Sequence, residues 1–171
     1  MALDMSPPGP VGQADPPDAA QRMPFPRHIP FVEKLGLELW AFGDGKAELR
    51  LDVAPDQLNY WAVAHGGVVM TLLDVAMAHA ARSGHVEGSH ATRDGTTAGP
   101  GVATIEMKTS FMRPAHGRLR ALGLMLHKTA TMAFTEGRVF DGEGQLCAHA
   151  TGTFKFVRAL TTASRSDKDK P

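Results

Sequence analysis

Residues 65–84 read His-Gly-Gly-Val-Val-Met-Thr-Leu-Leu-Asp-Val-Ala-Met-Ala-His-Ala-Ala-Arg-Ser-Gly, and this stretch decides the fold. Between positions 68 and 81 it holds no turn residue and is too long for one ordinary strand. Its alanines favour a helix, and Ser83-Gly84 supplies a stop. Because the helix is apolar on nearly every face, we expect it to be buried rather than to lie on the surface.

The segments before the helix predict a short helical turn followed by a hairpin. Residues 31–35 suggest the turn, with Gly36 as its C-terminal stop. A run from 37 to 42 then leads through Gly43-Asp44-Gly45 into 46–53, where apolar and polar residues alternate. A period of two with one polar face is typical of an antiparallel strand that covers a core on one side.

Four further strand candidates follow the helix. They are residues 102–112, 118–127, 132–140 and 145–157. The order is therefore two strands, one long buried helix and four strands. The economical architecture is α+β, with a long central helix wrapped by an antiparallel sheet of about six strands.

The length of 171 residues fits one domain. Residues 1–23 hold many prolines and almost nothing to bury, so we expect a disordered tail there, and we expect the same of 159–171. The folded domain is predicted over 24–158. Within it, 83–100 is an unusually long loop that either covers a site or is simply mobile.

The composition excludes several partners. Lys plus Arg equals Asp plus Glu at 18 each, so no basic excess predicts binding to nucleic acid or to an anionic membrane. No signal peptide or bilayer-spanning stretch is visible, and the single Cys147 excludes an internal disulfide. The expected location is the cytoplasm.

Asp74 is the polar residue that stands out in the apolar helix. An unpaired carboxylate there would be desolvated at a cost of roughly several kcal/mol, so it must find donors or have a raised pKa, and both are common at active sites. The alternative is an open face, or a structural contact with His79 or an arginine. On a helix, Asp74 shares a face with Gly67, Met70, Thr71, Met77, Ala78 and Ala81.

His65-Gly66-Gly67 directly precedes this helix. The glycine amides lie in the first turn without intrahelical partners, so they could bind a developing oxyanion. The alternative is that the two glycines only make a tight turn into the helix. His65 could be a base, a ligand or a structural hydrogen-bonding group.

Other catalytic signatures are missing from the sequence. The eight histidines are scattered without a His-Glu-x-x-His pattern, so no metal site is predicted. There is no Gly-x-Ser-x-Gly elbow. We expect Cys147, Trp40 and Trp61 to be packing residues.

The stretch Asn59-Tyr60-Trp61-Ala62-Val63-Ala64-His65-Gly66-Gly67, followed by Thr71-Leu72-Leu73-Asp74, resembles the signature of hotdog-fold acyl-CoA thioesterases of the phenylacetate-degradation (PaaI-like) subgroup. The resemblance covers roughly 30–158 and includes the segments 105–115 and 152–155. It implies a long helix inside an antiparallel sheet. It also implies homodimers that usually pair into tetramers, with active sites shared across the dimer interface.

The resemblance also assigns roles within the signature. Asp74 would be the nucleophile or the general base that activates water. The Gly66 amide, assisted by Asn59, would polarise the thioester carbonyl. Thr104 would help to hold the water, and His65 would orient the loop or the carbonyl. Ala62 stands where the family often has glycine, which could alter the loop slightly.

The implied substrate is an acyl-CoA, with coenzyme A as part of the substrate and no separate cofactor. Gly67 and Thr71 would contact it, and Arg113, Lys128 and Arg138 could meet its phosphates. For each of the three basic residues, a solvated charge at a strand end is the competing interpretation. The sequence leaves open whether the acyl group is aryl, short or medium in length.

Two other functions stay open at this point. An acyl-thioester dehydratase would need a catalytic histidine beside the carboxylate, and His65 is its candidate. A non-catalytic acyl-CoA-binding module would not need Asp74.

Overall fold

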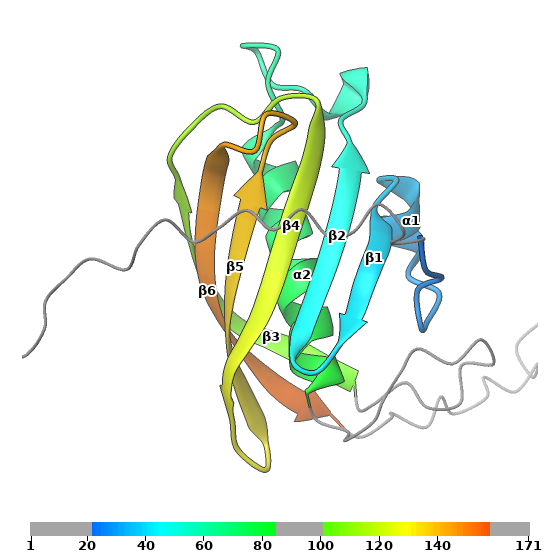
Figure 1. Ribbon diagram of the computed structural model, residues 1–171, viewed down its shortest axis with the longest axis vertical. Helices are drawn as coiled ribbons and strands as arrows, with labels where there is room; N and C mark the ends of the chain where they lie inside the picture. The colour runs from blue at the N-terminus through cyan, green and yellow to red at the C-terminus, as the bar shows by residue number, and fades with distance from the viewer. Residues whose placement is uncertain (1–21, 85–100, 158–171) are drawn as a thin grey trace, which may run out of the picture.

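The computed structural model describes residues 22–84 and 101–157, and Figure 1 shows one sheet curving around a long helix. The sheet has six strands in the order β1-β2-β4-β5-β6-β3, and every neighbouring pair is antiparallel. The elements are α1 (Pro30–Lys34), β1 (Glu38–Gly43), β2 (Lys46–Asp52), the 3-10 turn η1 (Pro55–Gln57), α2 (Gly66–Ser83), β3 (Gly101–Phe111), β4 (Arg118–Lys128), β5 (Met132–Phe140) and β6 (Leu146–Val157).

This architecture confirms the predicted α+β layering, and the predicted strands agree with the observed ones to within a residue or two. The expectations for 1–21, for 159–171 and for most of the 83–100 loop fall outside the described residues. The last two residues of the predicted N-terminal tail are described, and the Met23 amide donates to Leu39 O over 2.8 Å. In the part of the chain that the structure describes, no helix has the length and apolar character needed to cross a membrane.

Helix α2 forms the centre of the core because small residues let the sheet approach it closely. A Cβ at Gly123 of β4 would overlap the backbone of Ala76, so only glycine fits there. Leu72, Leu73 and Met77 are fully buried between the helix and the sheet. The apolar faces of the inner strands complete the core with residues that include Leu49, Ala121, Val139, Ala150 and Phe154.

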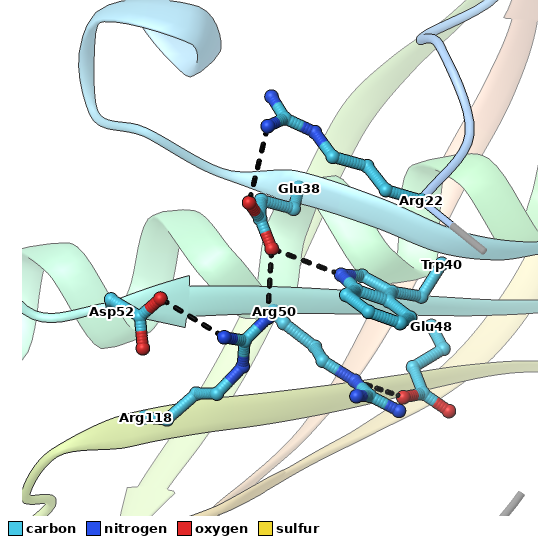
Figure 2. Close-up of polar contacts among 7 residues, drawn as sticks. All are labelled: Arg22, Glu38, Trp40, Glu48, Arg50, Asp52 and Arg118. Atoms are coloured by element: carbon cyan, nitrogen blue, oxygen red, sulfur yellow. Dashed lines mark hydrogen bonds and ion pairs between the residues drawn. The ribbon is translucent and has the colours of Figure 1, made fainter. Parts of the chain in front are cut away.

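The outer face of β1, β2 and β4 carries an ion-pair network, drawn in Figure 2. Arg118 donates from Nη1 to Asp52 Oδ2 over 3.1 Å and from Nη2 to Glu38 Oε2 over 2.9 Å. The guanidinium of Arg50 lies 4.0 Å from the ring centroid of Trp40 and donates from Nε to Glu48 over 2.7 Å. The network ties three neighbouring strands together.

This network also corrects one detail of the predicted hairpin. The alternating pattern assigns Glu48 to a solvated face, but only 7% of Glu48 is exposed. The side chains of Trp40 and Arg50 cover that face, and the bond from Arg50 satisfies the carboxylate. Trp40 is a packing residue, as expected, although it packs on the outside of the sheet.

Strand β3 lies at the edge of the sheet and pairs only with β6 among the described strands. Its register shifts between Thr104 and Glu106, which leaves Ile105 as the extra residue of a bulge. Ile105 is 56% exposed and Phe111 is 54% exposed. An unpaired edge with large apolar side chains is a template for a further strand.

Candidate active site

Asp74 lies at the seam between α2 and the edge strand β3. It is half-buried, and Thr104 Oγ1 donates to its Oδ1 over 2.7 Å. Burial raises the pKa of Asp74 above its ordinary value, and the hydrogen bond from Thr104 opposes that rise. Asp74 makes no ion pair with any described residue, so among these residues the alternative of a structural contact with His79 or an arginine is not observed.

A cavity of about 510 Å³ opens beside Asp74, between α2, β3 and the segment that contains α1. The residues predicted to share a helix face with Asp74 point in two directions. Met70, Thr71 and Ala78 line the cavity with Asp74, whereas Met77 and Ala81 point into the core and are fully buried. The rest of the wall is mostly apolar and includes Ile29, Phe31, Val75, Val102 and Met107.

The loop that precedes α2 is organised by Asn59. Asn59 Oδ1 accepts from the amides of Trp61 and Val63 over 2.9 and 3.3 Å, which leaves its Nδ2 without a partner among the described residues. Ala62 has a φ of 56°, a left-handed conformation that favours glycine. The alanine at position 62, where the family often has glycine, therefore introduces local strain. It leaves the two hydrogen bonds to Asn59 Oδ1 in place.

Trp61 is not a packing residue. It is 77% exposed, and its nearest aromatic contact is Tyr60, at 5.9 Å between ring centroids. Tyr60 itself is 94% exposed. The expectation failed because the tight turn at 59–63 carries both rings outward.

His65 caps the N-terminus of α2. Its Nδ1 accepts from the Gly67 amide over 3.0 Å, so the Gly67 amide is already engaged. The Gly66 amide makes no hydrogen bond to a described residue and lies close to Phe111, whose ring would be 3.6 Å from a Cβ at Gly66. Of the two predicted oxyanion donors, only Gly66 has a free N–H.

A smaller hollow of about 230 Å³ lies at this end of the helix. Asn59, Gly66, Phe111 and Arg113 line it, while Asp74 lines the larger cavity. Gly66 and Asp74 are eight residues apart on α2, or about 12 Å along the helix axis. One chain therefore brings Thr104 to Asp74 and Asn59 to Gly66, but it keeps these two pairs apart.

The remaining predicted substrate contacts are spread over the molecule. Thr71 Oγ1 donates to Gly67 O over 2.9 Å, and Arg113 donates to Leu146 O over 2.9 Å beside the smaller hollow. Lys128 donates to Gly84 O over 2.6 Å near the opposite end of α2. Arg138 pairs with Glu136 over 2.6 Å on the outer face of the sheet. Only Arg113 lies near the Gly66 amide.

Two polar residues of α2 that the sequence analysis did not select also line the larger cavity. They are His79 and Arg82, which are 2% and 5% exposed. His79 Nδ1 lies 2.8 Å from Val75 O, and burial lowers the pKa of His79 to about 4, so the ring is neutral and donates through Nδ1. The sequence carries a signal for Arg82, because Asp74, Ala78 and Arg82 follow one another at four-residue intervals and so lie on one helix face.

Cys147 is buried, and burial raises the pKa of its thiol, which disfavours the thiolate that a nucleophile needs. Within residues 22–84 and 101–157, no three His, Cys, Asp or Glu side chains gather as metal ligands would. The groups available for chemistry are a carboxylate and a hydroxyl at the seam and, at the start of α2, a backbone amide without a partner among the described residues.

A single long helix wrapped by a curved six-stranded antiparallel sheet is the hotdog fold of thioesterases. The model of the Thioesterase superfamily matches residues 62–148, and this chain belongs to that family. The chain is 30% identical over 141 residues to the medium/long-chain acyl-CoA thioesterase YigI of Salmonella typhimurium, an alignment that covers 76% of this chain and 87% of YigI.

Solved structures agree with this assignment. Protein PA5202 of Pseudomonas aeruginosa is 30% identical and superimposes with a TM-score of 0.66, over 77% of this chain and 97% of the other. PaaI from the phenylacetic acid degradation operon of Escherichia coli has a TM-score of 0.63 over 74% of this chain and 83% of its own. At 19% identity, PaaI supports the fold alone.

Proposed function

We propose that this protein hydrolyses acyl-CoA thioesters to a free acid and coenzyme A. The observation that carries the proposal is the Asp74 carboxylate, hydrogen-bonded by Thr104 and facing an apolar cavity large enough for an acyl chain. The similarity to YigI, which is named as a medium/long-chain acyl-CoA thioesterase, supports the same substrate class.

The chemistry needs an activated oxygen and an oxyanion site. In the general-base route, the Asp74 carboxylate takes a proton from a water molecule, which Thr104 Oγ1 helps to hold. The water oxygen then attacks the thioester carbonyl carbon. In the nucleophilic route, Asp74 attacks the carbonyl itself, and water later hydrolyses the anhydride. In both routes the C–S bond breaks and coenzyme A leaves as its thiolate, which takes up a proton.

The oxyanion donor on this proposal is the amide of Gly66, assisted by the free Nδ2 of Asn59. Because these groups lie about 12 Å along α2 from Asp74 of the same chain, a second copy must supply them. An antiparallel dimer that pairs the two β3 edges would place the start of one α2 opposite the middle of the other. Each active site would then combine Asp74 and Thr104 of one protomer with Gly66 and Asn59 of its partner.

The competing functions have less support. In a dehydratase, His65 would have to transfer protons at the substrate, but its Nδ1 is engaged in capping α2. A binding module would gain nothing from a half-buried carboxylate whose desolvation weakens the fold. Of the basic residues, Arg113 is the best placed to meet a coenzyme A phosphate, since it lines the hollow beside Gly66.

The test is the release of free thiol from a panel of acyl-CoAs by the wild-type protein and by Asp74→Asn. We expect the substitution to reduce kcat by about 1,000-fold, within the range of general acid–base contributions. Glu143→Lys, in the exposed β5–β6 turn, is the control and should leave kcat unchanged. Undiminished hydrolysis by Asp74→Asn would exclude the mechanism, and a wild type that releases no thiol would exclude the function.

Incubation in labelled water distinguishes the two routes. A single turnover through an anhydride would place labelled oxygen in the Asp74 carboxyl group if water attacks the Asp74 side of the anhydride, whereas base catalysis places label only in the released acid. Labelled Asp74 therefore demonstrates the nucleophilic route, and trapping of the anhydride with hydroxylamine tests it when water attacks the acyl side.

A further inference from the structure

Arg82 is a buried cation without a counter-ion among the described residues. It lies in the last turn of α2 and is 5% exposed, and its Nε and Nη2 atoms are buried and donate to no acceptor. The nearby charge of Arg27 adds to burial in lowering the pKa of Arg82. Arg27 itself makes no ion pair with a described residue.

An arrangement of this kind is costly for the free protein. A buried charge is normally paired, and an unpaired polar donor loses its hydration without replacement. Methionine or leucine would fill the same position in an apolar helix without that penalty. Uncompensated polar groups of this kind are typical of sites that a ligand completes.

Arg82 belongs to the same cavity as Asp74. Both side chains line it, as does Arg27, and Ala78 lies between Asp74 and Arg82 on the helix face. The two functional positions are eight residues, or about 12 Å, apart along α2. The wall between them is apolar, with Val75 and Val102 among its residues.

We propose that the preferred substrate is an acyl-CoA whose acyl chain ends in a carboxylate, that is, a monothioester of a dicarboxylic acid, and that Arg82 binds that carboxylate. The inference rests on the proposed function and names the substrate class of the same site. The thioester lies at Asp74, the methylene chain follows α2, and the terminal carboxylate accepts from the guanidinium of Arg82, which lines the cavity. A guanidinium can bind a carboxylate through two parallel hydrogen bonds.

The neighbouring histidine fits the same ligand. His79 lines the cavity one turn from Arg82, and its Nε2 has no partner in the described part of the chain. With Nδ1 donating to Val75 O, Nε2 can accept from a water molecule on the carboxylate. An extended chain of roughly ten carbons spans about 12 Å, since C–C bonds of about 1.5 Å advance the chain by about 1.3 Å each. Shorter chains fit to the extent that the side chains of Asp74 and Arg82 reach toward one another.

The experiment compares kcat/KM for two series of CoA thioesters with chains of six to ten carbons. One series ends in a methyl group and the other in a carboxylate. We expect the wild type to prefer the carboxylate series at its best length. We expect Arg82→Met to lower kcat/KM for that series by about 10- to 100-fold and to raise it for the methyl series, which reverses the preference. Arg120→Met, on the outer face of β4, is the matched control and should change neither series.

Thermal unfolding supplies a second readout without substrate. Because Arg82 has no partner among the described residues, Arg82→Met should raise Tm, and the free dicarboxylic acid should raise the Tm of the wild type but not that of the variant. A lower Tm for Arg82→Met would instead identify Arg82 as a structural residue and overturn the proposal.

The kinetic outcomes separate this proposal from the proposed function. A wild type that hydrolyses the methyl series and rejects the carboxylate series would overturn the role of Arg82 and leave the thioesterase assignment intact. An equal loss on both series in Arg82→Met would overturn it too, since that result would show that Arg82 does not distinguish the two chain ends. No hydrolysis of either series would refute the proposed function itself.

Discussion

At the scale of single residues, the proposed site depends on the half-buried carboxylate of Asp74. Among the described residues Asp74 has one hydrogen-bond partner, Thr104, and burial raises the pKa of Asp74 despite that bond. The protonated acid is therefore favoured in the folded state relative to the unfolded chain. The ionised form, which the proposed mechanism requires, weakens the fold.

Because the folded state favours protonated Asp74, we expect Asp74→Asn to be more stable than the wild type by an amount that depends on pH. The favourable contribution of protonated Asp74 is complete below its ordinary pKa of 3.8 and is lost as the pH rises through the higher pKa of the folded state. The free energy of unfolding of Asp74→Asn should therefore exceed that of the wild type increasingly across this window, and by a constant amount above it. Urea unfolding from pH 3 to 8 measures the difference. A difference that shrinks as the pH rises would contradict the assignment.

Thr104 predicts a shift in the pH profile of the reaction. Thr104→Val removes the donor that favours ionised Asp74, so the acid limb of kcat/KM should move to higher pH and kcat should fall by about 10-fold. Thr104→Ser keeps the hydroxyl and serves as the control. An unshifted acid limb in Thr104→Val would show that this hydrogen bond does not tune the catalytic group.

At the scale of elements, the approach of α2 to the sheet sets the shape of the site. Gly123 lets β4 reach the backbone of the helix at Ala76, and Gly137 and Gly152 make room for Met77. The helix thereby packs against the middle of the sheet and leaves the seam with β3 open. The cavity is a consequence of this lateral position.

A single methyl group at the closest approach should test this packing. Gly123→Ala forces α2 and β4 apart and should lower the free energy of unfolding by about 1–3 kcal/mol. Gly43→Ala, whose added Cβ would meet no atom within 4 Å, is the matched control and should change stability by less than about 0.5 kcal/mol. Equal effects of the two substitutions in urea unfolding would contradict the close approach.

At the scale of the whole molecule, one chain holds the two parts of the proposed site at separate places. The carboxylate and its hydroxyl partner lie at the middle of the seam, and the free amide lies at the start of α2. The exposed apolar edge strand offers the surface through which a second copy would join these parts. Activity is therefore expected to depend on assembly.

Ile105→Glu should separate assembly from folding. A charge at this position of the β3 edge, which is 56% exposed, should yield smaller particles in light scattering. It should reduce kcat by at least about 100-fold while the circular dichroism spectrum stays unchanged. Leu126→Glu on β4 starts from the same 56% exposure and is the control. A monomeric Ile105→Glu with full activity would show that each chain holds a complete site.

The sequence by itself determined the order of elements, the buried helix and the prominence of Asp74, because apolar periodicity, turn residues and a carboxylate in an apolar run are local signals. Only the tertiary structure decided that His65 accepts a hydrogen bond from the Gly67 amide and that Trp61 is exposed. Packing also decided that Met77 lies in the core while Arg82 lines the cavity of Asp74. These outcomes depend on which helix face meets the sheet, and that choice comes from contacts between residues far apart in the chain.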